Sequence, residues 1–378
     1  MNLKLFFKAT PIIEGLSQSA LGNSIKSLTD DSLDLEQMDL ALLGLTEDRG
    51  TQVNLGVSEG ADRIRERFYR LKKSNTSYKL ADLGNLQNGE TYDDTIARLR
   101  EVCEHLMAHK VVPIIIGGTH DLSLGQYYAY ESKNNLISAL NIDARLDVEI
   151  QGDHNETFLS KLITHQPNFL FSYNHLGHQE YLVEADALNA LEKLYFEALR
   201  LGEIRDNIQQ AEPVIRMSNM LAFDTSAIKS SDAPGNAKAE PFGLTGEEAC
   251  QLMWYAGMNE KMSSVSISEY NPTLDDQLEK TASIIGTMIW YFIEGYYNRK
   301  DTGQFNSDNY TKYTVSFEGS EDIMTFFKSN LTEKWWMLVS YGEGHLDRAY
   351  IPCSYEDYTA ATHGDFPERW IKAQGKLI

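Results

Sequence analysis

The segment Asn141–Asp147 places two carboxylates and an arginine where they could serve one reactive site. It reads Asn-Ile-Asp-Ala-Arg-Leu-Asp, and side chains at positions i, i+2 and i+4 of an extended chain point the same way. Asp143, Arg145 and Asp147 can therefore face a common pocket. A hydrolytic site with two metal ions would require a histidine at position 145, and this chain has an arginine there.

A second segment, Ala222–Ser226, repeats the pattern on a smaller scale. It reads Ala-Phe-Asp-Thr-Ser, so Asp224 and Ser226 share one side of an extended chain. A two-metal site would require an aspartate at position 226. Whether the chain is an enzyme therefore depends on Arg145 and Ser226.

The elements that must position these residues follow the pattern of a parallel α/β sheet, because short apolar runs alternate with amphipathic stretches. Several runs are apolar throughout, as strands covered on both faces are. The predicted strands are Asp39–Leu45, Leu80–Leu83, Val111–Ile116, Leu136–Ile142, Asn168–Phe171, Met220–Phe223 and Ser264–Ile267. The predicted helices are Ala61–Leu71, Thr95–Ala108, Ala185–Leu201, Thr245–Ala256 and Gln277–Tyr297, the fourth with a capping box of Thr245 and Glu248.

Four polar residues each fall just after a predicted strand: His120, Asp143, Asp224 and Glu269. In open parallel sheets, ligands bind beyond the carboxyl ends of the strands. We therefore expect the chemistry of this protein at that edge of the sheet.

The pattern changes from about Gly303 onward, which predicts two domains, residues 1–302 and 303–378. Two strands, Thr314–Phe317 and Trp336–Val339, and a short helix around Asp322–Phe327 predict a small α+β appendage. Its tyrosines and tryptophans either pack on the main domain, as we expect, or form a surface for a protein partner.

The bulk composition restricts the partners. The net charge is -21, which argues against nucleic acid or an anionic membrane, since both require a basic surface. Neither a signal peptide nor an apolar run of about 18 residues is present, so we expect a cytoplasmic protein. The three cysteines are far apart and fit a reducing compartment.

The motifs around these residues occur in a definite order. They are Gly117-Gly118-Thr119-His120-Asp121, Asp143-Ala144-Arg145-Leu146-Asp147, Asp224-x-Ser226 with Pro234-Gly235 downstream, Gly243-Leu244-Thr245, and Glu269-Tyr270-Asn271-Pro272. Gly60-Ala61-Asp62-Arg63-Ile64-Arg65 and Asp82-Leu83-Gly84-Asn85 are secondary matches. Over roughly residues 35 to 300, the chain resembles the arginase/agmatinase/formimidoylglutamase (ureohydrolase) family.

That resemblance implies an arginase-like fold, a three-layer αβα sandwich with a mainly parallel central sheet. It also implies hydrolysis of C–N bonds in guanidines or amidines by two Mn²⁺ ions that lower the pKa of a bridging water. Family members are usually oligomers, so a homo-oligomer is expected here. The family's usual substrate would make a small amidine or guanidine the ligand of this chain.

Carried over residue by residue, the resemblance assigns His120, Asp143, Asp147 and Asp224 to the first metal. The two ligands used only by the second metal are replaced by Arg145 and Ser226. Arginine cannot ligate a metal, because its guanidinium stays protonated and has no lone pair to give.

A charge count leaves two interpretations open. Three ionised aspartates would be balanced by one Mn²⁺ ion together with Arg145, whose guanidinium would form hydrogen bonds with Asp143 and Asp224. Alternatively, the site holds no metal and its carboxylates take up protons. We favour one ion per chain.

Two further residues receive catalytic roles from the resemblance. His154 matches a proton-shuttling histidine, and Glu269 matches the carboxylate that holds the substrate's guanidinium. In a one-metal enzyme, Arg145 would stabilise developing negative charge. Two functions follow: a C–N hydrolase with doubtful two-metal activity, or a non-catalytic protein that keeps the fold for binding or assembly.

Overall fold

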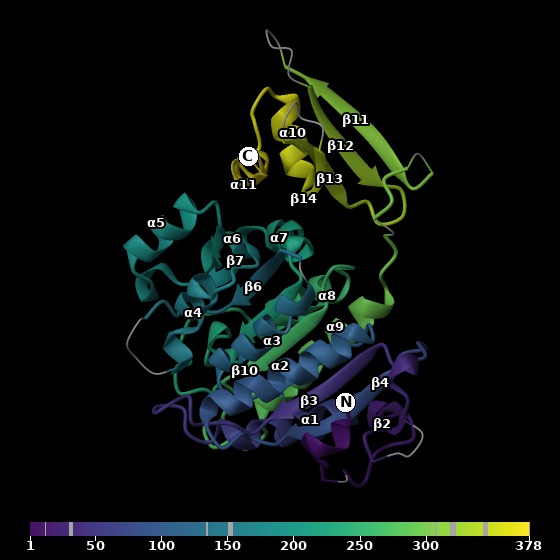
Figure 1. The fold of residues 1–378 in the computed structure, drawn as a ribbon, viewed down its shortest axis with the longest axis vertical. Coiled ribbons are helices and arrows are strands. Elements are labelled where there is room, and N and C mark those ends of the chain that lie inside the picture. The colour runs from purple at the N-terminus through teal and green to yellow at the C-terminus, as the bar shows by residue number, and fades with distance from the viewer. Residues whose placement is uncertain are drawn as a thin grey trace.

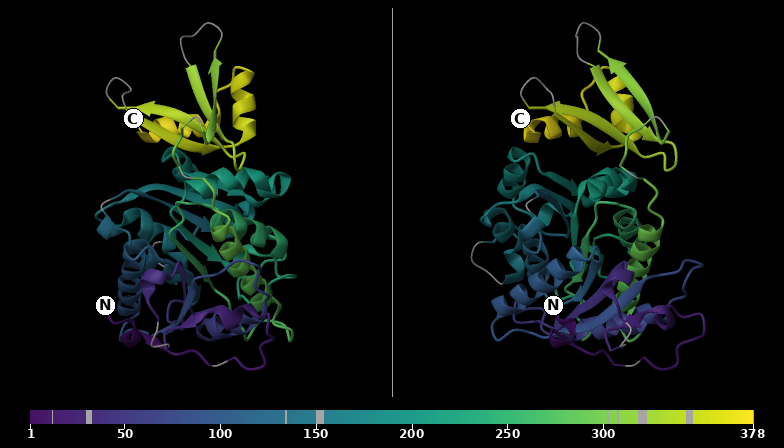
Figure 2. Two further views of the ribbon diagram at one scale, coloured as in Figure 1. Left: turned by 90° about the vertical axis from the view of Figure 1, so that its right-hand side faces the viewer. Right: turned by 45° about the vertical axis from the view of Figure 1, so that its right-hand side comes forward.

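The computed structural model describes the whole chain except residues 12, 30–32, 134, 150–153, 302, 307, 318–322, 343–346 and 378. Figure 1 shows a large α/β body and, above it, a smaller unit formed by the C-terminal part of the chain. The two further views in Figure 2 show the same separation into a body and an appendage. The predicted architecture is confirmed: helices lie on both faces of a mainly parallel sheet, and an extra sheet follows at the C-terminus.

The central sheet has ten strands, and β1 is antiparallel to its neighbour β4 while the other pairs are parallel. In sheet order, the strands are β1 (Phe7–Lys8), β4 (Leu80–Leu86), β3 (Leu40–Leu45), β5 (Val112–Gly117), β10 (Ser264–Ser268), β9 (Met220–Asp224), β6 (Ile137–Ile142), β7 (Leu170–His178) and β8 (Glu197–Arg200), with β2 (Lys26–Ser27) beside β4. Chain order reverses around β5, β10, β9 and β6, which is where open α/β sheets bind ligands.

Each face of the sheet carries its own apolar core. Side chains of α1, α6, α7, α8 and α9 pack in one buried cluster, and those of α2, α3, α4 and α5 pack in the other. The helices are α1 (Gly60–Arg70), α2 (Tyr92–Ala108), α3 (Ser123–Tyr128), α4 (Phe158–Thr164), α5 (Ala185–Lys193), α6 (Leu201–Asp206), α7 (Ala211–Met217), α8 (Gly246–Gly257) and α9 (Lys280–Tyr297). The predicted capping box of Thr245 and Glu248 is present at the start of α8.

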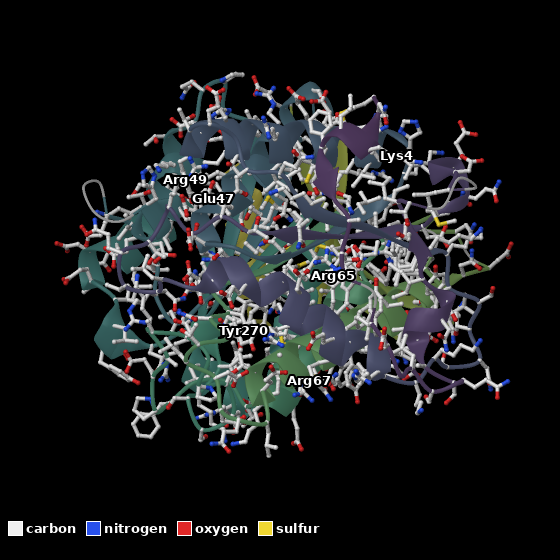
Figure 3. All side chains as sticks on the ribbon, turned by 90° about the horizontal axis from the view of Figure 1, so that it is seen from below. Lys4, Glu47, Arg49, Arg65, Arg67 and Tyr270 are labelled. Atoms are coloured by element: carbon white, nitrogen blue, oxygen red, sulfur yellow. The ribbon has the colours of Figure 1, made fainter. Side chains whose placement is uncertain are left out.

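The two secondary sequence matches meet in space at a buried ion pair. Arg65 of α1 is labelled in Figure 3, and its Nε donates to Asp82 Oδ2 of β4 at 2.8 Å. Its Nη2 also donates to the carbonyl of Gly84 at 2.9 Å. Arg65 is 1% exposed, so this fully satisfied guanidinium fixes α1 against the strand.

The appendage differs from its prediction. The expected helix around Asp322–Phe327 is wrong, because Ile323–Ser329 forms strand β12; Asp322 itself lies outside the described residues. The run Ile-Met-Thr-Phe-Phe favours a strand, since β-branched and aromatic side chains suit a pleated surface. The appendage is an antiparallel sheet of β11 (Tyr310–Ser316), β12, β13 (Trp335–Tyr341) and β14 (Asp347–Cys353), followed by α10 (Tyr355–Thr362) and α11 (Glu368–Leu377).

Arg216 of α7 links the appendage to the body. Its side chain is 4% exposed, and its Nη1 and Nη2 donate to the carbonyls of Trp335 and Cys353 at 3.0 and 3.2 Å. The guanidinium also lies 4.2 Å from the centre of the Trp336 ring. The predicted boundary between residues 302 and 303 stays a prediction, because Thr302 lies outside the described residues.

Two other segments differ from the sequence interpretation. The predicted helix Ala185–Leu201 is wrong beyond Lys193, because Tyr195 adopts a left-handed φ of 57° and β8 follows it. The predicted strand Asn168–Phe171 is too short, because β7 begins at Leu170 and continues to His178. No helix in the described parts of the chain is long and apolar enough to cross a membrane.

Candidate metal centre

His120 enters the site from the turn that follows β5. Gly117 and Gly118 adopt left-handed φ values of 81° and 72°, and a Cβ at Gly117 would lie 2.9 Å from the carbonyl oxygen of Leu45. Only glycine suits such a close approach with positive φ. The two glycines therefore turn the chain sharply enough to bring His120 over the strand ends.

Hydrogen bonds fix the imidazole of His120. Its Nε2 lies 2.9 Å from Asn141 Oδ1, an oxygen that can only accept, so Nε2 carries a proton. Its Nδ1 lies 2.9 Å from Ser268 Oγ, a hydroxyl that can donate to it. Both ring nitrogens are thus held by protein groups, which fix the orientation of the imidazole, and a metal ion at Nδ1 would replace the contact with Ser268.

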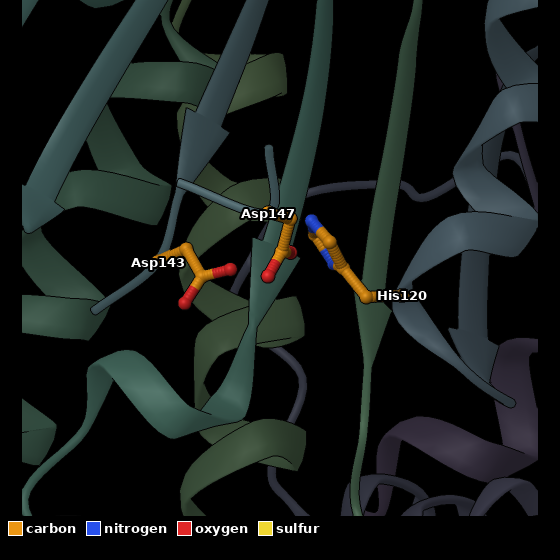
Figure 4. A group of neighbouring side chains, drawn as sticks. All are labelled: His120, Asp143 and Asp147. Atoms are coloured by element: carbon orange, nitrogen blue, oxygen red, sulfur yellow. The ribbon is translucent and has the colours of Figure 1, made fainter. Parts of the chain in front are cut away.

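Asp143 and Asp147 come from the segment after β6, and the structure brings both to His120. One possible ligand atom of each residue lies within 4.8 Å of the others. Figure 4 shows Asp147 between Asp143 and His120. Asp147 has a left-handed φ of 50°, a backbone strain of about 1–3 kcal/mol that is typical of functional positions.

The electrostatics of this trio favour a cation. Asp143 Oδ2 and Asp147 Oδ2 are buried, and no donor group among the described residues of the chain reaches either oxygen. Burial, and then the charge of Asp224, raise the pKa of Asp143 to about 6. Burial, followed by the charges of Asp143 and Asp224, raises the pKa of Asp147 well above its usual value. Orphaned carboxylate oxygens beside an imidazole fit a divalent ion such as Mn²⁺.

Asp224 borders the trio without belonging to the same close group of ligand atoms. It ends β9, and its Oδ1 accepts hydrogen bonds from the backbone of Ser226 at 2.6 Å and from Asn236 Nδ2 at 3.3 Å. Ser226 Oγ donates in turn to Asp143 Oδ1 at 3.1 Å. Ser226 is therefore a neutral donor beside the trio.

Arg145 does not make the contacts predicted for it. Its guanidinium donates to Glu240 Oε1 at 2.6 Å and to the carbonyl of Lys238 at 3.4 Å. Only its backbone N–H donates to Asp143, at 2.9 Å. The expected ion pairs with Asp143 and Asp224 are thus wrong, because Glu240 supplies a closer, half-exposed carboxylate on the other side of the chain.

Glu269 follows β10 and faces the same pocket. Its carboxylate accepts hydrogen bonds from Asn54 Nδ2 and from the backbone of His120, both at 2.8 Å. Burial, followed by the charge of Asp224, raises the pKa of Glu269 to about 8. Glu269 also has a left-handed φ, of 67°, so two of the acidic residues at this edge carry backbone strain.

His154 lies at the rim of the site. Its side chain is 49% exposed, its ring packs 4.8 Å from that of Tyr92, and its Nδ1 lies 3.2 Å from Lys161 Nζ. The buried carboxylate of Asp121, next to His120, is 3.9 Å away. His154 is therefore near the motif that carries His120, in contact with solvent.

Lys238 is the residue that the sequence interpretation missed. Its Nζ donates to Glu156 Oε1 at 2.9 Å, and its positive charge acts on Asp147, Asp224 and Glu269. Its place three residues after Pro234-Gly235 was the available signal. Among the described residues, His120, Asp143 and Asp147 are the only three histidine, cysteine or acidic side chains grouped closely enough to hold a metal ion.

A mainly parallel αβα sandwich with an acidic, histidine-containing pocket at its strand ends defines a class of metal-dependent hydrolases. Comparison with known proteins specifies the family. The model of the Arginase family matches residues 38–294, so the chain belongs to the Arginase family.

Formimidoylglutamases are among its relatives. The protein of that name from Staphylococcus aureus (strain JH9) is 25% identical over 268 residues, which cover 68% of this chain and 86% of the relative. The crystal structure of Trypanosoma cruzi formiminoglutamase with Mn²⁺ has a TM-score of 0.66 at 22% identity and covers 71% of this chain and 97% of that one. Formimidoylglutamase from Bacillus subtilis has a TM-score of 0.67 at 19% identity and covers 76% and 95%.

Proposed function

We propose that this protein is a metal-dependent hydrolase of C–N bonds in a linear amidine or guanidine, and that it works with one Mn²⁺ ion per chain. The observation that carries the proposal is the pair of buried, unpartnered oxygens of Asp143 and Asp147 beside His120. An uncompensated buried carboxylate is costly, and a divalent ion would relieve it. The manganese bound by the trypanosomal relative supports the choice of ion.

The protein's own residues would divide the work. His120, Asp143 and Asp147 would hold the ion, with Asp224 completing the set from β9. When bound, the ion would lower the pKa of a coordinated water, so that hydroxide is available near neutral pH. The two positions that the resemblance assigns to the second metal alone hold Arg145 and Ser226 in place of its ligands, so two-metal chemistry is not proposed.

Glu269 and His154 would handle the substrate and its proton. Glu269, anchored by Asn54 and His120, can accept hydrogen bonds from an amidinium group as that group enters. His154, exposed at the rim, can carry the proton that the leaving amine requires between the pocket and solvent. Arg145, held by Glu240, would act on the substrate only from the rim.

Elemental analysis tests this function directly. Protein purified with Mn²⁺ and then desalted is expected to hold about one ion per chain, and His120→Ala is expected to hold none. The loaded protein would then be assayed for ammonia, urea or formamide release from a panel of amidines and guanidines, with formimidoylglutamate included. Absence of metal from the wild-type protein would contradict the proposal, and two ions would contradict the one-ion reading.

A second function has one observation in its favour. The polar groups on the second-metal side already bond to protein partners, with Ser226 on Asp143 and Arg145 on Glu240. A protein that keeps the fold for binding or assembly would show this closure. Metal binding without turnover of any amidine would favour this function over the hydrolase.

Cellular context and assembly complete the proposal. We infer a cytoplasmic protein that assembles as a homo-oligomer and acts on a small molecule. Trp335 and Trp336 of the appendage are each 7% exposed and Trp336 lies against Arg216, which supports packing on the main domain, whereas Tyr355 is 61% exposed. Size-exclusion chromatography with light scattering would measure the assembly state.

A further inference from the structure

A histidine from the neighbouring strand holds the backbone carbonyl of Asp143. His175 of β7 is fully buried, and its Nε2 lies 3.1 Å from the carbonyl oxygen of Asp143. A carbonyl oxygen can only accept, so Nε2 carries the proton and donates it. The side chain of His175 therefore binds the main chain at the residue whose carboxylate belongs to the candidate metal centre.

The other nitrogen of this imidazole is fixed as well. Tyr173 Oη lies 2.9 Å from His175 Nδ1, and Tyr173 is also fully buried. Burial lowers the pKa of His175 to about 3, so the ring is neutral and its Nδ1 accepts a hydrogen bond from the Tyr173 hydroxyl. The two hydrogen bonds determine both the tautomer and the orientation of the ring.

His175 acts where the regular pairing of β6 with β7 ends. The last residues in register are Ile142 and Leu176, and Gly177 then adopts a left-handed φ of 92° as the pairing of β7 with β8 becomes irregular. Such irregularities re-aim side chains next to active sites. The backbone N–H of Asp143 still donates to the carbonyl of Leu176 at 3.1 Å, and His175 adds a second hydrogen bond to Asp143.

His175 lies in register with Asn141, which orients the histidine of the site. Asn141 Oδ1 accepts a hydrogen bond from His120 Nε2 at 2.9 Å. Side chains in register on adjacent strands lie on the same face of a sheet. Two neighbouring strands thus supply one contact each to the metal centre, β6 through Asn141 to His120 and β7 through His175 to Asp143.

We propose that His175, oriented by Tyr173, is a positioning residue that fixes the direction of the Asp143 carboxylate toward the metal ion. This inference rests on the proposed metal-dependent function. Two peptide planes meet at the Cα of Asp143, and each is held by a hydrogen bond, one to Leu176 and one from His175. The direction of the Cα–Cβ bond follows from these two planes, so loss of the histidine would release the carboxylate from its fixed direction.

The test compares Mn²⁺ binding by two variants whose amides differ in reach. His175→Gln places its amide nitrogen near the position of the imidazole Nε2, whereas the shorter side chain of His175→Asn does not extend to the Asp143 carbonyl. Titration calorimetry on the full-length protein is expected to give about tenfold weaker binding for His175→Asn and binding within about threefold of wild type for His175→Gln. Wild-type affinity in His175→Asn, or an equal loss in both variants, would overturn the proposal.

His178→Asn is the matched control. His178 lies on the same strand, is 4% exposed, and has its ring centre 5.8 Å from that of His175. Its Nδ1 has no hydrogen-bond partner among the described residues, and its ring meets the backbone of Leu199 in β8. Mn²⁺ affinity is expected to stay at the wild-type value, and a loss equal to that of His175→Asn would overturn the assignment to His175.

Hydrogen exchange of the metal-free protein separates this inference from the proposed function. The backbone amides of residues 143–145 are expected to exchange about fivefold faster in His175→Asn than in His178→Asn, because loss of the hydrogen bond frees the peptide group after Asp143. If wild type binds no Mn²⁺, the proposed function fails, while this comparison still decides whether His175 positions Asp143. Equal exchange rates in the two variants would overturn that role.

Discussion

The buried carboxylates on the two sides of the acidic pocket have different surroundings. On the side of His120, Asp143 and Asp147, two carboxylate oxygens are buried and receive no hydrogen bond from a donor in the described part of the chain. On the side of Asp224 and Ser226, the protein supplies donors: a backbone N–H and an amide reach Asp224 Oδ1, and the Ser226 hydroxyl reaches Asp143 Oδ1. One side is left for a cation and the other is closed by hydrogen bonds.

This difference shows which side of the pocket is affected by the serine at position 226. Replacing a carboxylate ligand with serine removes a negative charge and adds a donor, so Ser226 bonds to Asp143 where a second ion would compete for it. Lys238 adds a positive charge nearby. The following experiments are arranged from the largest expected effect to the smallest.

Substitution of Asp143 should abolish the cation site that it forms with His120 and Asp147. Asp143→Asn keeps the shape of the side chain but removes the charge next to His120 and Asp147. We expect Mn²⁺ affinity to fall at least about 100-fold, measured by titration calorimetry, because a neutral amide is a weak ligand for a hard cation. Binding within a few-fold of wild type would place the ion elsewhere.

Restoring the histidine and the aspartate that a second metal requires should allow both sides of the pocket to bind an ion. Arg145→His combined with Ser226→Asp is expected to raise metal content from about one Mn²⁺ per chain to about two. The new histidine must turn inward, away from Glu240, so the gain requires both substitutions. Each single variant serves as a control and should stay near one ion. One ion in the double variant would show that the backbone does not place these positions for a second site.

The pH dependence of the free energy of unfolding should report the raised pKa values of the buried carboxyl groups. The folded-state pKa values of Asp143, about 6, and Glu269, about 8, lie above their ordinary values. The folded apo protein therefore holds protons that the unfolded chain has lost, and this contribution to stability, present near pH 4, is lost as pH rises through about 6 to 8.

Thermal unfolding across this range measures the effect. We expect the Tm of the apo protein to fall by several degrees between about pH 5 and pH 8.5, and we expect a smaller fall when Mn²⁺ is bound to the deprotonated carboxylates. Asp143→Asn should flatten the apo profile. A Tm that rises over this interval equally in both proteins would contradict the raised pKa values.

The smallest effect is expected from Ser226→Ala. The substitution removes the 3.1 Å hydrogen bond from the Ser226 hydroxyl to Asp143 Oδ1. The backbone N–H of Arg145 still donates to the same oxygen. Mn²⁺ affinity should change by less than about fivefold, with a stability loss of about 1 kcal/mol in chemical denaturation. A loss of metal as large as in Asp143→Asn would mean that the closed side also holds the ion.

The sequence predicts the convergence at the site better than it predicts side-chain direction. His120, Asp143 and Asp147 each follow a buried strand, and the parallel order of β5 and β6 brings them to one edge. The direction of Arg145 depends on Glu240, which lies 95 residues away in the chain, so local spacing could not reveal it.

In the fold, too, some elements were predicted correctly from the sequence and others were not. Strands buried on both faces, such as β3 and β9, were recognisable from continuous apolar runs. The edge strand β8 and the appendage strand β12 were read as helix, because short apolar runs lack a decisive period. Pairing with neighbours, rather than local preference, determines their conformation.

The anchoring of Arg216 has a consequence for how the two parts of the chain depend on each other. Its buried guanidinium serves the body through Glu212 and the appendage through the carbonyls of Trp335 and Cys353. Removal of residues 303–378 would take away both carbonyl acceptors and the Trp336 ring, and would leave the Arg216 guanidinium with Glu212 and water. The body and the appendage therefore share this residue, and a change at its contacts on one side alters the packing of the other.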